Sequence, residues 1–292
     1  MRLQAFELKE PLPRLREPHA FAMLRPWIDI GNVGTMLLSR LEACFGSKEL
    51  GNLARPGNFF DFTRYRPNIC LQDGTRQLVI PNATVTYARR ESGNDFIFLH
   101  LLEPHMLGEA YANSILRLLE LLKVKRYLLL GSMYDIVPHT RPFLVTGGST
   151  AKKLGEDLEK AGVRSSNYQG PTTITYLVPQ KAVELGIEST SLIVHLPQYL
   201  PLEEDYTGLV RLMEVIYTLY GVPVDKSDME KAMNQRNDID MAVSRDSKLK
   251  AFVTHLESYY EEKGKKQEEL PKGLSSEVEG FLKEIERRFR QN

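Results

Sequence analysis

Ionisable residues gather in one short segment near the middle of the chain. Asp135, His139 and Arg141 lie close together there, and Pro138 and Pro142 stiffen the segment. Histidine exchanges protons near neutral pH, and arginine binds anions through a rigid fork of donors. The combination could serve a hydrolase or a phosphorylase, in which His139 or Asp135 handles protons and Arg141 neutralises a negative charge.

Two glycine-bearing turns could supply an anion site for such an enzyme, because backbone amides at the start of a helix bind anions. The candidate ligand-binding residues are Gly31, Asn32 and Gly34 in the first turn, and Gly147, Gly148, Ser149 and Thr150 in the second. We expect the two turns to lie near each other if both reach the carboxyl edge of a sheet. The first spacing, Gly-x-x-Gly, lacks the third glycine of a dinucleotide fingerprint. Tight turning and close helix packing are the simpler interpretation.

A structural role for the central segment is the alternative to chemistry. An arginine fork can bridge a carboxylate and several carbonyl groups, and flanking prolines lower the entropy that is lost when a loop becomes ordered. The sequence contains no Gly-x-Ser-x-Gly elbow, no His-Glu-x-x-His helix and no paired-cysteine metal motif. The pattern therefore favours a polar network that pins the loop, while catalysis and non-catalytic ligand binding stay open.

A metal site is not predicted. His100, Glu103 and His105 carry groups that bind metals, but alternation along a strand directs His100 away from the other two. His100 lies in an apolar strand pattern and is better explained as a hydrogen-bonded histidine of the core. We expect neither a metal nor an organic cofactor.

The central segment is expected to follow an interior strand of a parallel sheet. Residues 126–131 form an apolar run ended by a glycine, which is typical of a strand covered by helices on both faces. The segment after such a strand lies at the carboxyl edge of the sheet, where ligands usually bind. Further strands are expected at residues 21–24, 96–102 and 192–196, and helices at residues 108–124, 151–160 and 209–220 and after Gly34 and Gly170.

Residues 58–90 follow a different pattern. Short apolar runs alternate there with the turn signals Asp73-Gly74 and Pro81-Asn82. This spacing predicts a β meander that is attached to one edge of the main sheet.

The chain is expected to divide into an α/β body, residues 1–224, and a helical extension, residues 225–292. Apolar residues recur every three to four positions in residues 249–260 and again in residues 278–289, with a charged linker at residues 264–269 between them. Both stripes must be covered, by the body of the chain or by a partner. Docking on the chain's own body is the simpler expectation.

Composition indicates a soluble cytoplasmic protein. The 292 residues contain 38 lysines and arginines and 38 aspartates and glutamates, a balance that argues against binding to nucleic acid or to an acidic membrane. No stretch approaches the length of about 20 apolar residues that a membrane span needs. Two cysteines fit a reducing compartment, and Cys44 follows Leu37 and Leu41 at helical spacing, so a core position is expected for it.

Four motifs in succession resemble the bacterial branch of the proteasome assembly chaperone 2 family, from about His19 to about Tyr260. They are Asp29-Ile30-Gly31-Asn32-Val33-Gly34, Pro138-His139-Thr140-Arg141-Pro142, Gly170-Pro171-Thr172-Thr173 and His195-Leu196-Pro197-Gln198-Tyr199-Leu200. The resemblance implies a three-layer α/β/α sandwich related to the nucleoside phosphorylase and hydrolase folds. It also implies a homo-oligomer, with a trimer as the first expectation.

The function expected from this resemblance is that of a non-catalytic, protein-binding assembly factor or scaffold with an unidentified protein client. The alternative is a hydrolase or phosphorylase-like enzyme, or a binder, for a nucleoside-like or other anionic small molecule. A crevice filled by side chains or buried between subunits would favour scaffolding, whereas an ordered phosphate or other ligand that contacts both glycine turns and His139 would favour chemistry.

Overall fold

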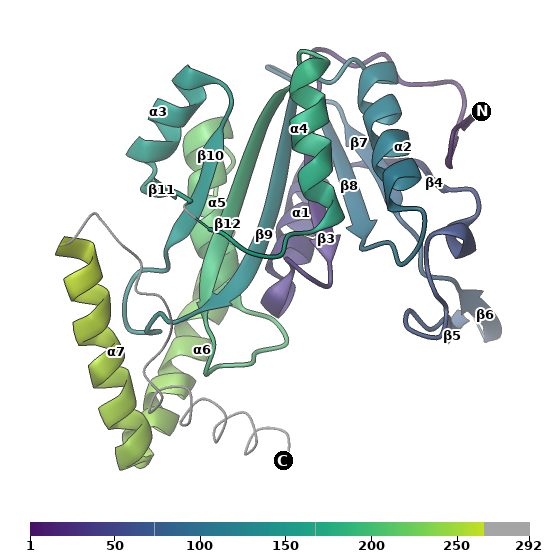
Figure 1. Ribbon diagram of the computed structural model, residues 1–292. Coiled ribbons are helices and arrows are strands. Elements are labelled where there is room, and N and C mark those ends of the chain that lie inside the picture. The colour runs from purple at the N-terminus through teal and green to yellow at the C-terminus, as the bar shows by residue number, and fades with distance from the viewer. Residues whose placement is uncertain (73, 167, 266–292) are drawn as a thin grey trace.

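The computed structural model describes residues 1–72, 74–166 and 168–265, and Figure 1 shows its elements. Within these residues the chain forms an α/β fold around one large mixed sheet, with a separate sheet of two strands. The centre of the large sheet is parallel. Its four neighbouring strands are, in spatial order, β8 (Phe96–Leu102), β3 (His19–Arg25), β9 (Arg126–Asp135) and β12 (Glu188–Pro197).

Antiparallel strands extend this parallel centre on both sides. On one side β7 (Thr84–Ala88) pairs with β8, followed by β4 (Lys48–Leu53), β2 (Phe6–Leu8) and β1 (Arg2–Leu3). On the other side β10 (Val145–Ser149) runs antiparallel to β12. The short strand β11 (Val163–Ser165) pairs in parallel with β10 at the outer edge.

Strand β9 is the central strand that its apolar run predicts. It lies between β3 and β12, and its side chains alternate between two hydrophobic clusters, one on each face of the sheet. Tyr127 and Leu129 belong to one cluster, whereas Leu128 and Leu130 belong to the other. Burial on both faces explains why this strand lacks the polar alternation of a surface strand.

Helices cover both faces of the sheet (Figure 1). One face packs against α2 (Gly108–Leu121) and α4 (Leu177–Glu184), which follows the short 3-10 turn η3 (Ile174–Tyr176). The opposite face packs against α1 (Val33–Phe45), α3 (Lys152–Lys160) and α5 (Tyr206–Tyr220). Two further 3-10 turns are η1 (Ile30–Asn32), which leads into α1, and η2 (Pro56–Asn58), which follows β4.

Two helices follow the body. Figure 1 shows α6 (Lys226–Arg245) and α7 (Ser247–Lys265) at the end of the sheet where β9 and β12 finish. Phe252, Val253 and Leu256 of α7 form a small buried cluster with Val243 and Tyr199, so the first predicted apolar stripe is covered by the chain itself. The second predicted stripe, residues 278–289, and most of the predicted linker lie outside the described residues.

Two expectations about local structure were wrong. The meander predicted for residues 58–90 joins the main sheet only through β7, because β5 (Asn68–Gln72) and β6 (Thr75–Val79) form a separate hairpin. Figure 1 shows this hairpin projecting beside the sheet. Cys44 is exposed and not in the core, where it was expected. After Leu41, the next side chain of α1 that packs against the core is Phe45.

Candidate functional site

The central segment leaves the sheet at the carboxyl edge, as predicted, but β9 continues to Asp135, four residues beyond the predicted end of the strand at Gly131. Asp135, the last residue of β9, is in register with Pro197, the last residue of β12, because the two strands are parallel. The following residues therefore start at the carboxyl edge of the sheet. An isolated bridge between Asp29 and Ser132 brings the first glycine turn to the same edge.

Asp135 begins a chain of hydrogen bonds that crosses three strands. Its Oδ2 lies 2.8 Å from Nδ1 of His195 in β12, and Nε2 of His195 lies 2.8 Å from Oγ1 of Thr146 in β10. Carboxylate, imidazole and hydroxyl follow one another as in a hydrolytic triad. Thr146, however, lies inside the β10 ladder, opposite Ile193, and not on an exposed turn. The arrangement joins neighbouring strands without presenting a nucleophile.

His139 lies buried against the helical extension, with 3% of its surface exposed. Its Nδ1 contacts the hydroxyl of Tyr199, and its backbone amide donates to the same oxygen at 2.9 Å. Its Nε2 lies 3.0 Å from Oδ1 of Asp240 in α6. Burial lowers the pKa of His139, so the neutral imidazole is favoured. Both ring nitrogens are occupied by the chain itself.

Arg141 holds α7 against the segment. Its Nη1 donates to Oε1 of Glu257 at 3.0 Å, and its Nη2 donates to Oε1 of Glu261 at 2.6 Å. The neighbouring Thr140 hydroxyl also donates to Glu257. The hydroxyl of Tyr260 donates to the Pro142 carbonyl at 2.9 Å. These contacts match the polar network of the structural alternative, and the carboxylates come from the extension.

The first glycine turn is filled by close packing. The carbonyl oxygen of Gly31 accepts from the Asp205 amide at 2.9 Å, and a side chain at Gly31 would come within 2.8 Å of the Asp205 Cβ. A side chain at Gly34 would likewise come within 3.0 Å of Oδ1 of Asp29. Nδ2 of Asn32 donates to the Glu203 carbonyl at 2.9 Å. Their geometry fits the packing interpretation, and anion binding at this turn stays a prediction.

Two buried carboxylates flank this turn. Asp29 accepts from the amide of Thr35 at 3.0 Å, while Asp205 accepts from the amide of Gly208 at 2.7 Å and caps α5. Burial raises the pKa of Asp29, and burial raises the pKa of Asp205 to about 6. Carboxyl oxygens, which accept hydrogen bonds, therefore flank the turn on both sides and disfavour an anion there.

The second glycine turn does not meet the first, and that expectation was wrong. Gly147, Gly148 and Ser149 are the last residues of β10, and they pair with Thr190, Ser191 and Leu192 in the first half of β12. The amide of Thr150 donates to the Ser189 carbonyl at 2.9 Å. Because β10 runs antiparallel to β12, its end lies toward the amino ends of the parallel strands. The first turn lies at their carboxyl ends.

The three residues weighed for metal binding serve separate contacts. Nε2 of His100 lies 3.0 Å from Oε2 of Glu42, and Nδ1 of His105 accepts from the Asp61 amide at 3.1 Å. Oε1 of Glu103 accepts from the Ile174 amide at 3.1 Å. In the part of the chain that the structure describes, no three histidine, cysteine or acidic residues group as metal ligands would.

Comparison with known proteins places the chain in a family. The model of the PAC2 family matches residues 23–238, which include the parallel centre of the sheet, the central segment and part of α6. The chain belongs to the PAC2 family. A search of curated protein sequences finds no match.

Several solved structures share the fold. A PAC2 family protein from Streptomyces avermitilis matches with a TM-score of 0.72 and 22% identity, over 81% of this chain and 99% of that one. A proteasome-assembly chaperone homologue from Mycobacterium tuberculosis matches with a TM-score of 0.70 and 22% identity, over 80% and 99%. An archaeal proteasome activator from Pyrococcus furiosus matches with a TM-score of 0.65 and 14% identity, over 81% and 97%.

Sequence reasoning missed several residues that hold the central segment of this PAC2 chain. Thr146, Asp240 and Glu257 carry no local signal, because their partners are distant in sequence. Asp205 had a usable signal, since an aspartate before an amphipathic helix is a common helix cap.

Among the described helices none combines the length and the apolar character of a membrane span.

Proposed function

We propose that the protein is a cytoplasmic, non-catalytic, protein-binding assembly factor whose protein client is not yet identified. One observation carries the proposal: the groups of the central segment that could do chemistry are bound by the chain's own side chains. His139 contacts Tyr199 and Asp240, and Arg141 contacts Glu257 and Glu261. These groups hold α6 and α7 in place. They therefore maintain the surface of the protein, and an assembly factor binds its client through its surface.

The relatives support a role in assembly. One solved structure with this fold is a proteasome-assembly chaperone homologue, and another is an archaeal proteasome activator. The helices on both faces of the sheet are compatible with the phosphorylase and hydrolase type of three-layer α/β/α sandwich, to which we assign the body of the chain.

Self-association completes the proposal. We expect a homo-oligomer, with a trimer as the first expectation. Within each chain we expect a body of residues 1–224 and an extension of residues 225–292. Native mass spectrometry of the full chain at micromolar concentration tests the subunit number. A single species at three times the chain mass is expected, whereas a monomer at every concentration would contradict self-association.

Affinity purification tests the assembly role. The tagged full chain is expressed in its native cells, cross-linked and analysed by quantitative mass spectrometry of both proteins and small molecules. A protein recovered in constant ratio to the chain is expected. Recovery of a small molecule without any reproducible protein would contradict the proposal.

A variant separates binding from chemistry in the same experiment. Thr146→Val removes the hydroxyl at the end of the Asp135 and His195 hydrogen-bond chain while it keeps the shape of the side chain. Capture of the client should be unchanged by this substitution. Loss of a co-purifying small molecule from a variant that remains folded, with protein capture unchanged, would favour the enzyme alternative, because the hydroxyl would then matter to ligand binding or chemistry.

A further inference from the structure

A pocket lies at the edge of the sheet opposite the C-terminal helices. It has a volume of about 250 Å³ and is bounded by the β1–β2 turn, by η2 and by α2. Because β1 forms one edge of the sheet and the hydrogen-bond chain of Asp135 involves strands near the other, this pocket is independent of the central segment. Ligand binding at this pocket would therefore be a property separate from the proposed assembly role.

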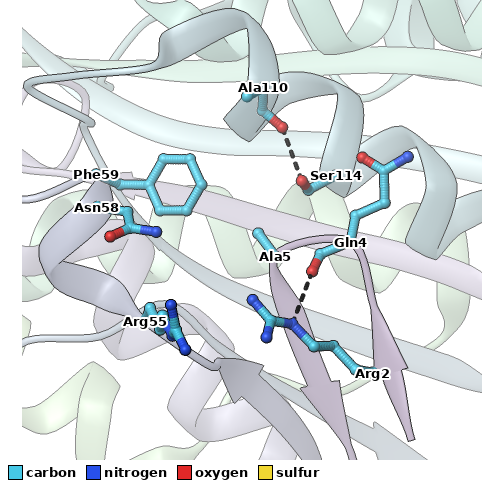
Figure 2. A pocket seen from close by; sticks show the side chains of 8 residues that line it. All are labelled: Arg2, Gln4, Ala5, Arg55, Asn58, Phe59, Ala110 and Ser114. Carbon is cyan, nitrogen blue, oxygen red and sulfur yellow. Dashed lines mark hydrogen bonds between the residues drawn. The ribbon is translucent and has the colours of Figure 1, made fainter.

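Two arginines give the pocket its charge. Figure 2 shows the side chains of Arg2 and Arg55 reaching toward the same space from β1 and from the residue before η2. Nε of Arg2 donates to the Gln4 carbonyl at 3.3 Å, which leaves its terminal nitrogens for a ligand. Within the described residues neither guanidinium has a carboxylate partner, unlike Arg40 and Arg141.

An anion is the kind of ligand that two cationic side chains lining one pocket would attract. A guanidinium presents paired donors that fit the two oxygens of a carboxylate. Arg2 and Arg55 are both exposed, so each can turn its donors toward a ligand without unfolding its surroundings. Asn58, which is also exposed and lines the same space, can add an amide donor.

The other wall of the pocket is apolar and rigid. The ring of Phe59 is 5% exposed and packs against the buried ring of Tyr111, with 5.3 Å between the ring centroids. Ala5 and Ala110 add small apolar surfaces. The hydroxyl of Ser114 donates to the Ala110 carbonyl at 2.7 Å, so it does not offer its proton to a ligand. A carbon skeleton suits this wall better than a bare inorganic ion does.

The backbone at the rim of the pocket forms a two-residue turn between β1 and β2. Gln4 has a φ of 50°, which is uncommon for a residue with a side chain. The adjacent carbonyl of Ala5 accepts from the Ala54 amide at 2.9 Å, which fastens the turn to the body of the chain. A positive φ is what the first residue of a two-residue hairpin turn requires, and the bond to Ala54 keeps this rim in place.

We propose that this pocket binds a small carboxylate, with the carboxylate group between Arg2 and Arg55 and a short apolar body against Phe59. The volume of about 250 Å³ corresponds to about eight water molecules at about 30 Å³ each, which is enough for a benzoate-sized ligand. The carboxylate can belong to a free organic acid or to the C-terminus of a peptide. Both present the same group to the arginines.

The test is a titration of the full chain with three probes. Binding is measured by isothermal titration calorimetry and by saturation-transfer NMR. Benzoate represents a free acid, N-acetylglycylphenylalanine represents a peptide C-terminus, and inorganic phosphate represents an anion without an apolar body. Saturable binding of benzoate or of the peptide, with weaker binding of phosphate, is expected. The tighter of the two carboxylates identifies the source. No saturable binding of either carboxylate, or tighter binding of phosphate, would overturn the proposal.

Charge variants locate the bound probe. Arg55→Gln and Arg2→Gln should each weaken carboxylate binding by about tenfold, as expected when a charged hydrogen bond is lost. Both side chains are exposed, so folding should be preserved, and circular dichroism checks this. Arg66→Gln, at another exposed arginine, is the matched control and should leave binding unchanged. Equal affinity in all four proteins would place the probe elsewhere and overturn the proposal.

Discussion

His19 couples the stability of the fold to acidity. It lies in β3 with 7% of its surface exposed, and its Nδ1 is 2.9 Å from the hydroxyl of Tyr220. Burial, reinforced by the positive charge of Arg126, lowers the pKa of His19 from 6.5 to about 4. The unfolded chain takes up the proton first. Stability linked to His19 is therefore complete above about pH 6.5 and is lost as the pH falls through about 4.

We predict that His19→Gln removes this loss of stability. Between pH 7 and pH 4 the wild type should lose about 3 kcal/mol of unfolding free energy relative to the variant, because glutamine binds no proton in this range. Urea unfolding at a series of pH values measures both proteins. A difference between them that is constant with pH would contradict the prediction.

Asp205 has the opposite effect in an overlapping range. Burial raises its pKa from 3.8 to about 6, so the folded chain holds the proton more tightly than the unfolded chain does. Its contribution to stability is complete below about pH 3.8 and is lost as the pH rises through about 6. At neutral pH the buried charge of Asp205 costs stability, although its oxygen still caps α5.

Asp205→Asn should therefore stabilise the protein at neutral pH. The amide oxygen can still accept from Gly208, and the variant should gain about 2 kcal/mol relative to the wild type between pH 4 and pH 7. Thermal and urea unfolding provide the measurement. If the variant were equally destabilised at both pH values, capping and not charge would dominate at this position.

Of the two adjacent glycines in β10, only Gly147 lies where a side chain would clash with the neighbouring strand. A side chain at Gly147 would overlap the carbonyl oxygen of Ser191 in β12, whereas the space beside Gly148 is open. Gly147→Ala should destabilise the protein by about 2–3 kcal/mol because the two strands must separate. Gly148→Ala is the matched control and should change stability by less than about 0.5 kcal/mol. Equal effects in chemical unfolding would contradict the assigned strand pairing.

The α7 helix depends on the central segment for its position. Glu257 accepts from both Arg141 and Thr140, and its side chain is 25% exposed. In Glu257→Ala the amides of α7 should exchange with deuterium about tenfold faster, since loss of a charged hydrogen bond favours local opening. Glu262→Ala, at an exposed carboxylate of the same helix, should leave exchange unchanged. Faster exchange in both variants would indicate a general effect of charge.

Across the whole molecule, local sequence patterns predicted the parallel centre well. The apolar runs in β3, β8, β9 and the second half of β12 are nearly continuous because helices cover both faces, and such burial leaves a clear mark on the sequence. The hairpin of β5 and β6 was predicted as strands but placed in the wrong sheet. Strand propensity does not state which sheet a strand will join.

The sequence by itself determined that residues 126–131 would lie in a buried strand and that the stiff segment with His139 and Arg141 would follow it at the carboxyl edge of the sheet. Only the tertiary structure decided what those groups do. Their partners include Asp240 and Glu257, about a hundred residues further along the chain, and β10 runs opposite to its neighbour β12. Pairing over such separations depends on how whole elements pack, and residue type and spacing do not encode it.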